Sequence, residues 1–144
     1  MNKKISKSQK LVYVIHKHWA SHLHYDLRLE EHGVLKSYAL PKGPPEKAGE
    51  KRLAVEVEDH PLSYAAFEGI IPEGQYGAGR VEIWDQGRYR ILGENQRMKE
   101  MIIYGQKLNG VYTLLKLEDK QKQKQNLWLF FRNKDQSKSD EEVE

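Results

Sequence analysis

Hydrophobic and polar residues alternate with a period of two along most of this chain. In residues 11–18, LVYVIHKH, the valines and histidines fall on one side of an extended backbone. In residues 23–30, LHYDLRLE, the leucines and Tyr25 fall on one side, and the other side carries His24, Asp26, Arg28 and Glu30. Because successive side chains of a strand point to opposite faces, this alternation predicts a β-strand in each segment.

Similar stretches occur along the rest of the chain. Further strands are predicted at 33–40, 52–58, 80–84, 88–92, 111–117 and 126–132. Gly33, Gly87 and Gly110 stand where short turns would join neighbouring strands, Gly87 as the last residue of the sequence DQG. Short connections of this kind favour an antiparallel meander.

One segment, residues 95–104, favours a helix instead, because Met98, Met101 and Ile102 would share one side of it. The chain therefore combines seven or more strands with one or two short helices. A sheet of that size in one small domain exposes its edges unless it closes on itself. The pattern predicts a mainly β fold, a compact antiparallel β-barrel.

The length of 144 residues fits a single domain. We expect a barrel domain over 11–133, a flexible basic arm over 1–10 and a polar, acidic tail over 134–144, because neither end has apolar periodicity. The lysine- and glutamine-rich residues 119–126 are expected at the exposed tip of a hairpin. No apolar run approaches the length of a membrane span, and LVYVI is too short for a signal-peptide core, so we expect a cytoplasmic protein without a membrane partner.

The absence of cysteine excludes disulfides, thiolate zinc sites and cysteine nucleophiles. Any metal ion must therefore be held by histidine and carboxylate groups. The formal net charge is +3, with lysines concentrated at the start of the chain and acidic residues at its end. The body of the chain is basic once the acidic tail is set aside, which is compatible with a phosphate-bearing partner.

His18, His24 and Asp26 form the strongest candidate metal site. Residues two apart on a strand point the same way at about 7 Å, so His24 and Asp26 can converge on one ion that His18 completes. Two imidazoles and a carboxylate suit Mn²⁺, Zn²⁺ or Fe²⁺ and leave positions open for water or substrate. The alternative is a solvated strand face, the commoner fate of an isolated His-x-Asp. Arg28 favours the metal site, because a cation beside a metal ion is costly unless an anion such as phosphate lies between them.

Other histidines are weaker candidates. His60, in EDHPLSY directly after a predicted strand, could bind phosphate or donate a proton, or it could be a surface histidine of a loop. His16 shares a strand face with His18 and could support the site from outside the ligand set. We expect His22 and His32 to be exposed.

Two segments could contact phosphate groups. Lys42 and Arg52 lie at the ends of a proline- and lysine-containing loop and could meet a nucleic-acid backbone, although solvated charges are the commoner case. The glycine-rich residues 71–79, IPEGQYGAG, could cradle a phosphate with backbone amides. A tight turn before a strand explains these glycines equally well.

Three motifs, in this order, give the chain a specific resemblance. H-x5-H-x-D-x-R begins at His18, E-D-H-P-x-x-Y begins at Glu58, and I-P-E-G-x-Y-G-x-G begins at Ile71. Together with ALPKGPP, LNGVYTLLKL and LWLFFR, they make residues 11–132 resemble the 3′-phosphoesterase domain of bacterial DNA ligase D and its stand-alone archaeal relatives.

The resemblance implies a β-barrel enzyme that depends on Mn²⁺, with Co²⁺ or Zn²⁺ as alternative ions. Such enzymes heal the 3′ ends of nucleic acid: they remove a terminal ribonucleoside and then the remaining 3′-phosphate to leave a 3′-hydroxyl. It implies metal ligands at His18, His24 and Asp26, catalytic residues at Arg28, His60 and Tyr64, and substrate-binding residues at Arg52 and Lys42. The chain departs from the family pattern at His16, where the family usually has glutamine.

The partner implied by this resemblance is a nucleic-acid 3′ end, such as a primer-template with a terminal ribonucleotide or 3′-phosphate. The chain is expected to work at the nucleoid, alone or with a separate DNA ligase and other end-joining proteins. Two rival functions stay open. A cupin-like non-haem iron oxygenase would use the same ligands but would not explain Arg28 beside His60. A non-catalytic nucleic-acid-binding barrel would make the histidine and aspartate face incidental.

Overall fold

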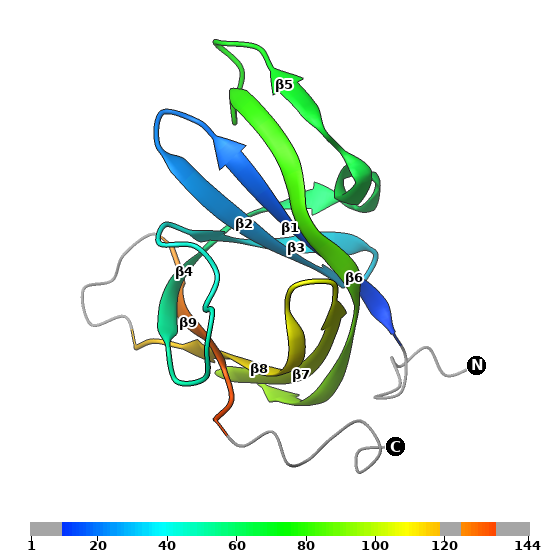
Figure 1. The fold of residues 1–144 in the computed structure, drawn as a ribbon, viewed down its shortest axis with the longest axis vertical. Helices are drawn as coiled ribbons and strands as arrows, with labels where there is room; N and C mark the ends of the chain where they lie inside the picture. The colour runs from blue at the N-terminus through cyan, green and yellow to red at the C-terminus, as the bar shows by residue number, and fades with distance from the viewer. Residues whose placement is uncertain (1–9, 119–124, 135–144) are drawn as a thin grey trace.

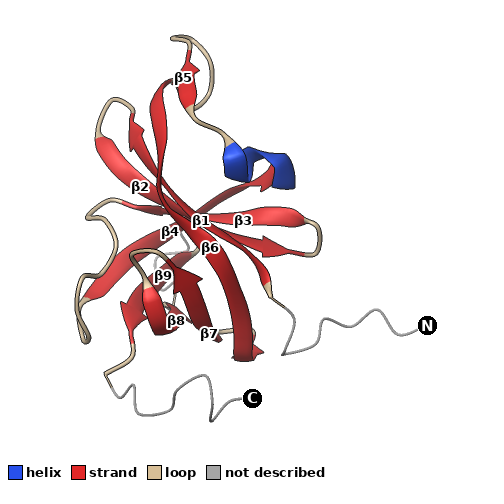
Figure 2. Cartoon of the chain, turned by 45° about the vertical axis from the view of Figure 1, so that its right-hand side comes forward, coloured by secondary structure: helices blue, strands red, loops and turns tan. Residues whose placement is uncertain are grey.

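The computed structural model of the protein describes residues 10–118 and 125–134. Within these ranges it contains nine strands and one short 3₁₀ helix (Figures 1 and 2). The elements are β1 Leu11–Trp19, β2 Leu23–Glu31, β3 Val34–Leu40, β4 Lys51–Pro61, η1 Leu62–Ala66, β5 Gly69–Ile71, β6 Gly79–Asn95, β7 Met98–Gly105, β8 Asn109–Lys116 and β9 Leu127–Arg132. The predicted basic arm, the acidic tail and the hairpin tip at 119–126 fall almost entirely outside the described residues.

The strands form a closed antiparallel barrel, as the alternation pattern predicted. Their order is β1-β2-β3-β4-β9-β8-β7-β6, and β6 pairs back onto β1 to complete the ring (Figure 1). Closure removes the exposed edges that an open sheet would carry. The short strand β5 pairs only with the beginning of β6, and it projects beyond the ring beside the β1–β2 hairpin. No helix in the described part of the chain is long and apolar enough to cross a membrane.

Strand alternation separates the barrel core from the candidate site. Tyr13 and Ile15 on β1 and Leu27 and Leu29 on β2 point into the barrel and belong to its hydrophobic core. Side chains at the alternate positions point to the outer face of the same two strands. They include His16, His18, Asp26 and Arg28. These four residues are nevertheless buried, because η1 and the segment between β5 and β6 cover this part of the wall. The histidine and aspartate face is therefore an outer surface of the barrel under a cover.

The predicted turn at Gly33 is present, but those at Gly87 and Gly110 are wrong. His32 and Gly33 both have positive φ, 53° and 85°, and form the two-residue turn between β2 and β3. Gly87 instead lies inside β6, which runs without a break through both segments that the sequence had divided. A Cβ at Gly87 would lie 2.1 Å from the carbonyl oxygen of Tyr104 on β7, so glycine permits close strand approach here. Gly110 lies within β8.

The helix predicted over 95–104 is also wrong, because most of this segment is strand β7. It pairs with β6 on one side and β8 on the other, so its backbone is fully used in the sheet. Met101, Ile102 and Ile103 are all buried. Apolar residues at 98, 101 and 102 would share one side of a helix, whereas three consecutive buried residues fit a strand covered on both faces, and the long-range pairing selects the strand. Of the one or two short helices expected, the described residues contain only η1.

Candidate metal and phosphate site

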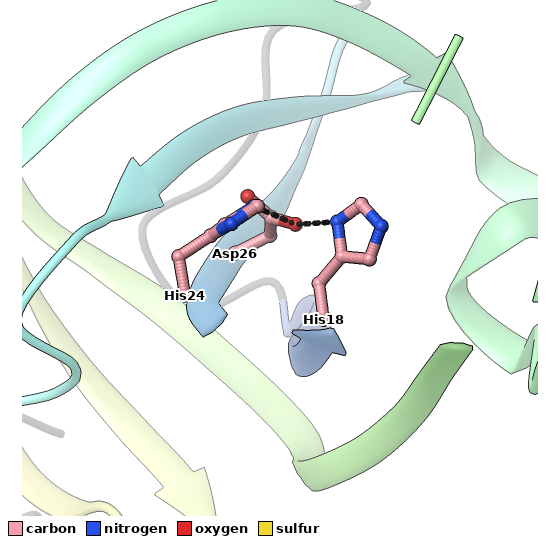
Figure 3. A group of neighbouring side chains, drawn as sticks. All are labelled: His18, His24 and Asp26. Carbon is pink, nitrogen blue, oxygen red and sulfur yellow. Dashed lines mark ion pairs between the residues drawn. The ribbon is translucent and has the colours of Figure 1, made fainter. Parts of the chain in front are cut away.

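The β1–β2 hairpin brings the three predicted metal ligands together. His18 is paired directly with His24 across the hairpin, and Asp26 follows two residues later on the same face of β2. One ligand atom from each residue lies within 4.8 Å of the other two. Figure 3 shows the Asp26 carboxylate beside both rings: Oδ2 is 3.6 Å from His18 Nδ1 and 3.3 Å from His24 Nε2. Two ring nitrogens and a carboxylate oxygen therefore face one point.

Backbone carbonyl groups select which nitrogen of each histidine faces that point. The Nε2–H of His18 donates to the carbonyl of Gly77 at 2.9 Å. The Nδ1–H of His24 donates to the carbonyl of His22 at 3.3 Å. The nitrogens that remain are those nearest Asp26, and an ion bound there would take the place of any proton between them and the carboxylate. Histidines that ligate metals are usually oriented by a hydrogen bond of this type from the other nitrogen, so the donor set fits a divalent transition-metal ion.

Asp26 is ionised in this environment although its residue is only 5% exposed. Burial alone would raise the pKa of its carboxyl group, but hydrogen bonds from His18 and His24 and the charge of Arg28 outweigh burial and hold the pKa well below its ordinary value. The contact with Asp26 in turn raises the pKa of His24. The carboxylate is thus available as an anionic ligand at neutral pH.

Arg28 lies two residues beyond Asp26 and is 4% exposed. Its guanidinium group donates hydrogen bonds in four directions. The acceptors are His16 Nδ1 at 3.0 Å, Ser37 Oγ at 2.9 Å, His60 Nδ1 at 3.2 Å and Asp26 Oδ2 at 3.4 Å. Burial lowers the pKa of Arg28 and Asp26 opposes that effect, but the ordinary pKa of arginine is so high that the group stays charged. The site therefore holds a fixed cation directly beside the three-ligand cluster.

His60 and Tyr64 complete the side of the site that carries Arg28. His60 lies near the end of β4, and Tyr64 is in η1, which follows at once. The Tyr64 ring lies 4.6 Å from the His60 ring, and the Cζ atom of Arg28 lies 4.9 Å from the Tyr64 ring centre. Burial and the neighbouring Arg28 both lower the pKa of His60, so its imidazole is neutral at pH 7. Burial raises the pKa of Tyr64, which stays a neutral phenol.

His16 is fully buried and supports Arg28 rather than the metal ligands. Its Nδ1 accepts the hydrogen bond from Arg28, and its Nε2–H donates to the carbonyl of Phe67 at 3.1 Å. Burial, followed by the charge of Arg28, lowers the pKa of His16 to about 4. A neutral ring with both nitrogens occupied is not free to bind the ion.

Lys42 and Arg52 are not brought to this cluster by the contacts that the structure shows. Lys42 is exposed in the loop after β3. Arg52 lies opposite Phe130 on the neighbouring strand, and its guanidinium contacts the carbonyl of Pro44 at 3.5 Å and the Glu50 carboxylate at 3.3 Å. Phe130 belongs to the barrel core, so Arg52 projects from the opposite face of the sheet to the metal ligands. A role for either residue in substrate binding stays a prediction.

Ser37 belongs to the site although its sequence context did not indicate it. It is fully buried, accepts the Arg28 hydrogen bond and donates its own hydroxyl hydrogen to the carbonyl of Leu35 at 3.1 Å. Its position opposite Arg28 in the β2–β3 register explains the contact. The one signal available was its position between Leu35 and Ala39 on one face of the predicted strand. The carbonyl groups of Phe67 and Gly77 have no side-chain signature at all.

The glycine-rich residues 71–79 adopt turns beside His18, one of the predicted metal ligands. The amide of Gln75 donates to the carbonyl of Pro72 at 3.3 Å, and the amide of Ala78 donates to that of Gln75 at 3.1 Å. In the described structure this segment offers His18 a carbonyl oxygen. Its contribution to the site is therefore an acceptor that orients a ligand.

Comparison with known proteins gives one consistent result. The family model described as the DNA ligase D 3′-phosphoesterase domain matches residues 16–116. The chain is 48% identical over 130 residues to the multifunctional non-homologous end joining protein LigD of Pseudomonas aeruginosa, and 44% identical over 137 residues to that of Mycolicibacterium smegmatis. These alignments cover 87% and 86% of this chain but only 15% and 17% of the relatives. The LigD protein of Mycobacterium tuberculosis is 42% identical over 128 residues.

Proposed function

Because this chain belongs to the DNA ligase D 3′-phosphoesterase domain family, we propose that it is a divalent-metal-dependent phosphoesterase that processes the 3′ ends of nucleic-acid strands. One observation carries the proposal beyond the family match. The buried Arg28 guanidinium lies 3.4 Å from the carboxylate of the three-ligand metal cluster. A fixed cation beside a metal ion is electrostatically unfavourable unless an anion lies between them, and a phosphate ester is such an anion.

The proposed reactions are two hydrolyses in sequence with Mn²⁺ as the ion. In the first, water attacks the last phosphodiester, the bond from phosphorus to the 5′ oxygen breaks, and the terminal ribonucleoside leaves with a proton on that oxygen. In the second, water attacks the remaining phosphate monoester, the bond from phosphorus to the 3′ oxygen breaks, and inorganic phosphate and a 3′-hydroxyl result. Because that hydroxyl is the end that a DNA ligase joins, we place the reaction beside a ligase and other end-joining proteins at the nucleoid.

The proposed roles of the residues are to supply positive charge to the phosphate and to hold that charge in a fixed orientation. A divalent ion held by His18, His24 and Asp26 would supply positive charge to the scissile phosphate and lower the pKa of the attacking water. Arg28 is held in place by its buried hydrogen bonds, so its charge is aligned before the substrate arrives. Fixed charge of this type stabilises the negative charge of a phosphoryl-transfer transition state without reorganisation.

His60 is proposed as a neutral hydrogen-bond donor to phosphate. Nδ1 of His60 lies 3.2 Å from the Arg28 guanidinium, which can only donate, and 3.2 Å from the carbonyl oxygen of Glu58, which can only accept. We propose the tautomer in which Nδ1 accepts from Arg28, because it leaves an Nε2–H to donate to phosphate. The lowered pKa of His60 argues against an imidazolium acid at neutral pH. Tyr64 packs on both groups and would hold the guanidinium and the imidazole in fixed positions relative to each other. We propose that Lys42 and Arg52 contact the strand away from the scissile phosphate.

The test uses labelled primer-templates that end in a ribonucleotide or in a 3′-phosphate, incubated with the protein and Mn²⁺. We expect a 3′-phosphate and then a 3′-hydroxyl from the first substrate and inorganic phosphate from the second. His18→Ala, purified in the same way, should be inactive, and His22→Ala should be active because only its backbone carbonyl contacts the site. Unaltered 3′ ends with the wild-type protein across Mn²⁺, Co²⁺ and Zn²⁺ would overturn the proposal.

The same preparations discriminate the two rival functions. Oxygen consumption with Fe²⁺ and a ketoacid, without phosphate release, would support an iron oxygenase. Binding of the primer-template that is steeply salt-dependent and unchanged in His24→Ala, without strand processing, would support a non-catalytic barrel. Neither rival accounts for a buried guanidinium that contacts both Asp26 and His60.

A further inference from the structure

Tyr76 is an exposed aromatic residue next to the candidate site. It lies in the segment between β5 and β6, and 74% of its surface is exposed. The following residue, Gly77, accepts the hydrogen bond that orients the proposed metal ligand His18. Tyr76 is thus one residue along the chain from a direct contact with the metal cluster.

The backbone around Tyr76 is held at both ends. The Gln75 amide closes a turn over residues 72–75, and the Ala78 amide closes a second turn over residues 75–78 that contains Tyr76. The segment begins and ends on the paired strands β5 and β6, where Ile71 lies opposite Gly79. Such bracing presents Tyr76 at a fixed place in solvent. Packing does not explain a tyrosine there, because most of its surface contacts nothing in the described structure.

The side of β5 and of the following segment that faces the metal cluster can be distinguished from the side that faces solvent. A Cβ built at Gly77 would lie 3.8 Å from Ile71 Cδ1 and 3.9 Å from His18 Cε1, so Ile71 faces the metal cluster. Ile70, its neighbour in the strand, therefore faces the other way, and it is 76% exposed. The carbonyl of Gly77 contacts His18 at 2.9 Å, so the backbone of Tyr76, one residue earlier, lies close to the proposed metal and phosphate position.

We infer that Tyr76 stacks on the base of the terminal nucleotide of the strand whose phosphate is processed. This inference rests on the proposed function. A phosphate bound between the metal ligands and Arg28 belongs to a nucleotide whose base is only one sugar away. Every base has an aromatic face, so stacking on tyrosine holds a strand end without selecting its sequence. An enzyme that heals varied ends needs contacts of that kind.

The experiment pairs protein variants with a change in the substrate. The substrates are two 3′-phosphorylated primer-templates, one with a normal terminal nucleotide and one whose terminal nucleotide is abasic. The variants are Tyr76→Ala, Tyr76→Phe and Ile70→Ala. Ile70→Ala is the matched control, because it removes an equally exposed hydrophobic side chain from the same projection on the other face.

We expect Tyr76→Ala to raise KM about tenfold on the normal substrate with little change in kcat, which is the pattern of lost substrate binding. On the abasic substrate Tyr76→Ala should match the wild type, because the base that it would contact is missing. Tyr76→Phe should keep the wild-type KM, since stacking needs the ring and not the hydroxyl. Ile70→Ala should match the wild type on both substrates.

Equal KM values for Tyr76→Ala and wild type on the normal substrate would overturn the inference. So would an equal penalty on the normal and the abasic substrates, because a structural or metal-binding defect does not depend on the base. Metal affinity and the melting temperature of Tyr76→Ala, measured alongside, should equal those of the wild type. Absence of phosphate release by the wild type from both substrates would instead overturn the proposed function, and the inference would fall with it.

Discussion

The Nε–H group of Arg28 donates a hydrogen bond to Nδ1 of His16 at 3.0 Å, and this bond fixes the tautomer of a fully buried histidine. The proton of His16 then lies on Nε2, which donates to the carbonyl of Phe67. His16 thus links the Arg28 guanidinium to the chain directly after η1. A second proton on this ring would face Arg28, so the histidine must stay neutral.

The first prediction concerns the pH dependence of stability. The pKa of His16 is about 4 in the folded protein, and its ordinary value is 6.5. Between these values the unfolded chain binds more protons than the folded protein, so the free energy of unfolding rises with pH. The contribution of His16 to stability is therefore lost as the pH falls from 6.5 to 4. The full difference amounts to about 3 kcal/mol. Urea denaturation with a chelator present, at pH 4.5 and pH 7, measures it.

His16→Gln is the control for this prediction. The glutamine side-chain oxygen can accept from Arg28, and its amide can donate to the Phe67 carbonyl, but the group does not titrate. We expect this variant to stay active and to lose less stability than the wild type between pH 7 and pH 4.5. Equal losses in the two proteins would show that His16 is not the titrating group. His16→Leu should lose activity about tenfold or more, because it leaves the buried Nε–H of Arg28 unpaired.

The second prediction is that Arg28→Lys resembles Arg28→Ala. The lysine ammonium retains the charge but cannot reach His16, Ser37 and His60 at once from one planar group. We expect kcat/KM for phosphate release to fall about 10²-fold or more in both variants. Affinity for Mn²⁺, measured by calorimetry, should persist in Arg28→Lys because all three metal ligands remain. Wild-type kinetics for Arg28→Lys would refute a role for the guanidinium geometry.

The third prediction is that a divalent ion stabilises the protein through His18, His24 and Asp26. An ion that binds only the folded state at 100 times its Kd adds about 2.7 kcal/mol to the free energy of unfolding. The melting temperature of the wild type should therefore rise with added Mn²⁺, and those of His24→Ala and Asp26→Ala should not. His22→Ala serves as the matched control, because its exposed ring is outside the cluster. Equal shifts in His24→Ala and wild type would place the ion elsewhere.

Strand periodicity made part of the site predictable. His24, Asp26 and Arg28 are two residues apart, so an extended backbone must place them on one face, as the structure shows. The hairpin pairing of His18 with His24 follows from the short connection between the two strands. The family motifs, rather than periodicity, related His60 and Tyr64 to the same site, because β3 and the β4–η1 junction bring them there.

The sequence pattern could not predict contacts that depend on strand register or on backbone groups. Ser37 meets Arg28 only because β3 pairs with β2 in one register out of several that the alternation allows. The sequence DQG looked like a turn, yet Gly87 is needed for the close approach of Tyr104 on a neighbouring strand. Segment 95–104 looked helical because its apolar spacing fits two structures, and only pairing with β6 and β8 selects the strand.

The fourth prediction separates barrel stability from the site. Asp85 is buried, and its carboxylate accepts hydrogen bonds from the Tyr13 hydroxyl and from three consecutive amides in the turn between β7 and β8. Asp85→Ala would leave these donors unpaired at the seam where β6 meets β1, and each such group costs about 1–3 kcal/mol.

We expect Asp85→Ala to lower the free energy of unfolding by about 3 kcal/mol or more in urea denaturation, since solvent that enters the turn can satisfy part of the lost bonding. Glu82→Ala, on the same strand and half-exposed, is the matched control and should change stability by less than about 1 kcal/mol. Asp85 pairs with Ile15, whose side chain points into the core, so it lies on the opposite face from the metal ligands. At a temperature where Asp85→Ala is folded, its kcat/KM should therefore match that of the wild type. A stable variant with reduced kcat/KM would show that Asp85 acts on the site, and a variant with wild-type stability would show that the turn closes without it.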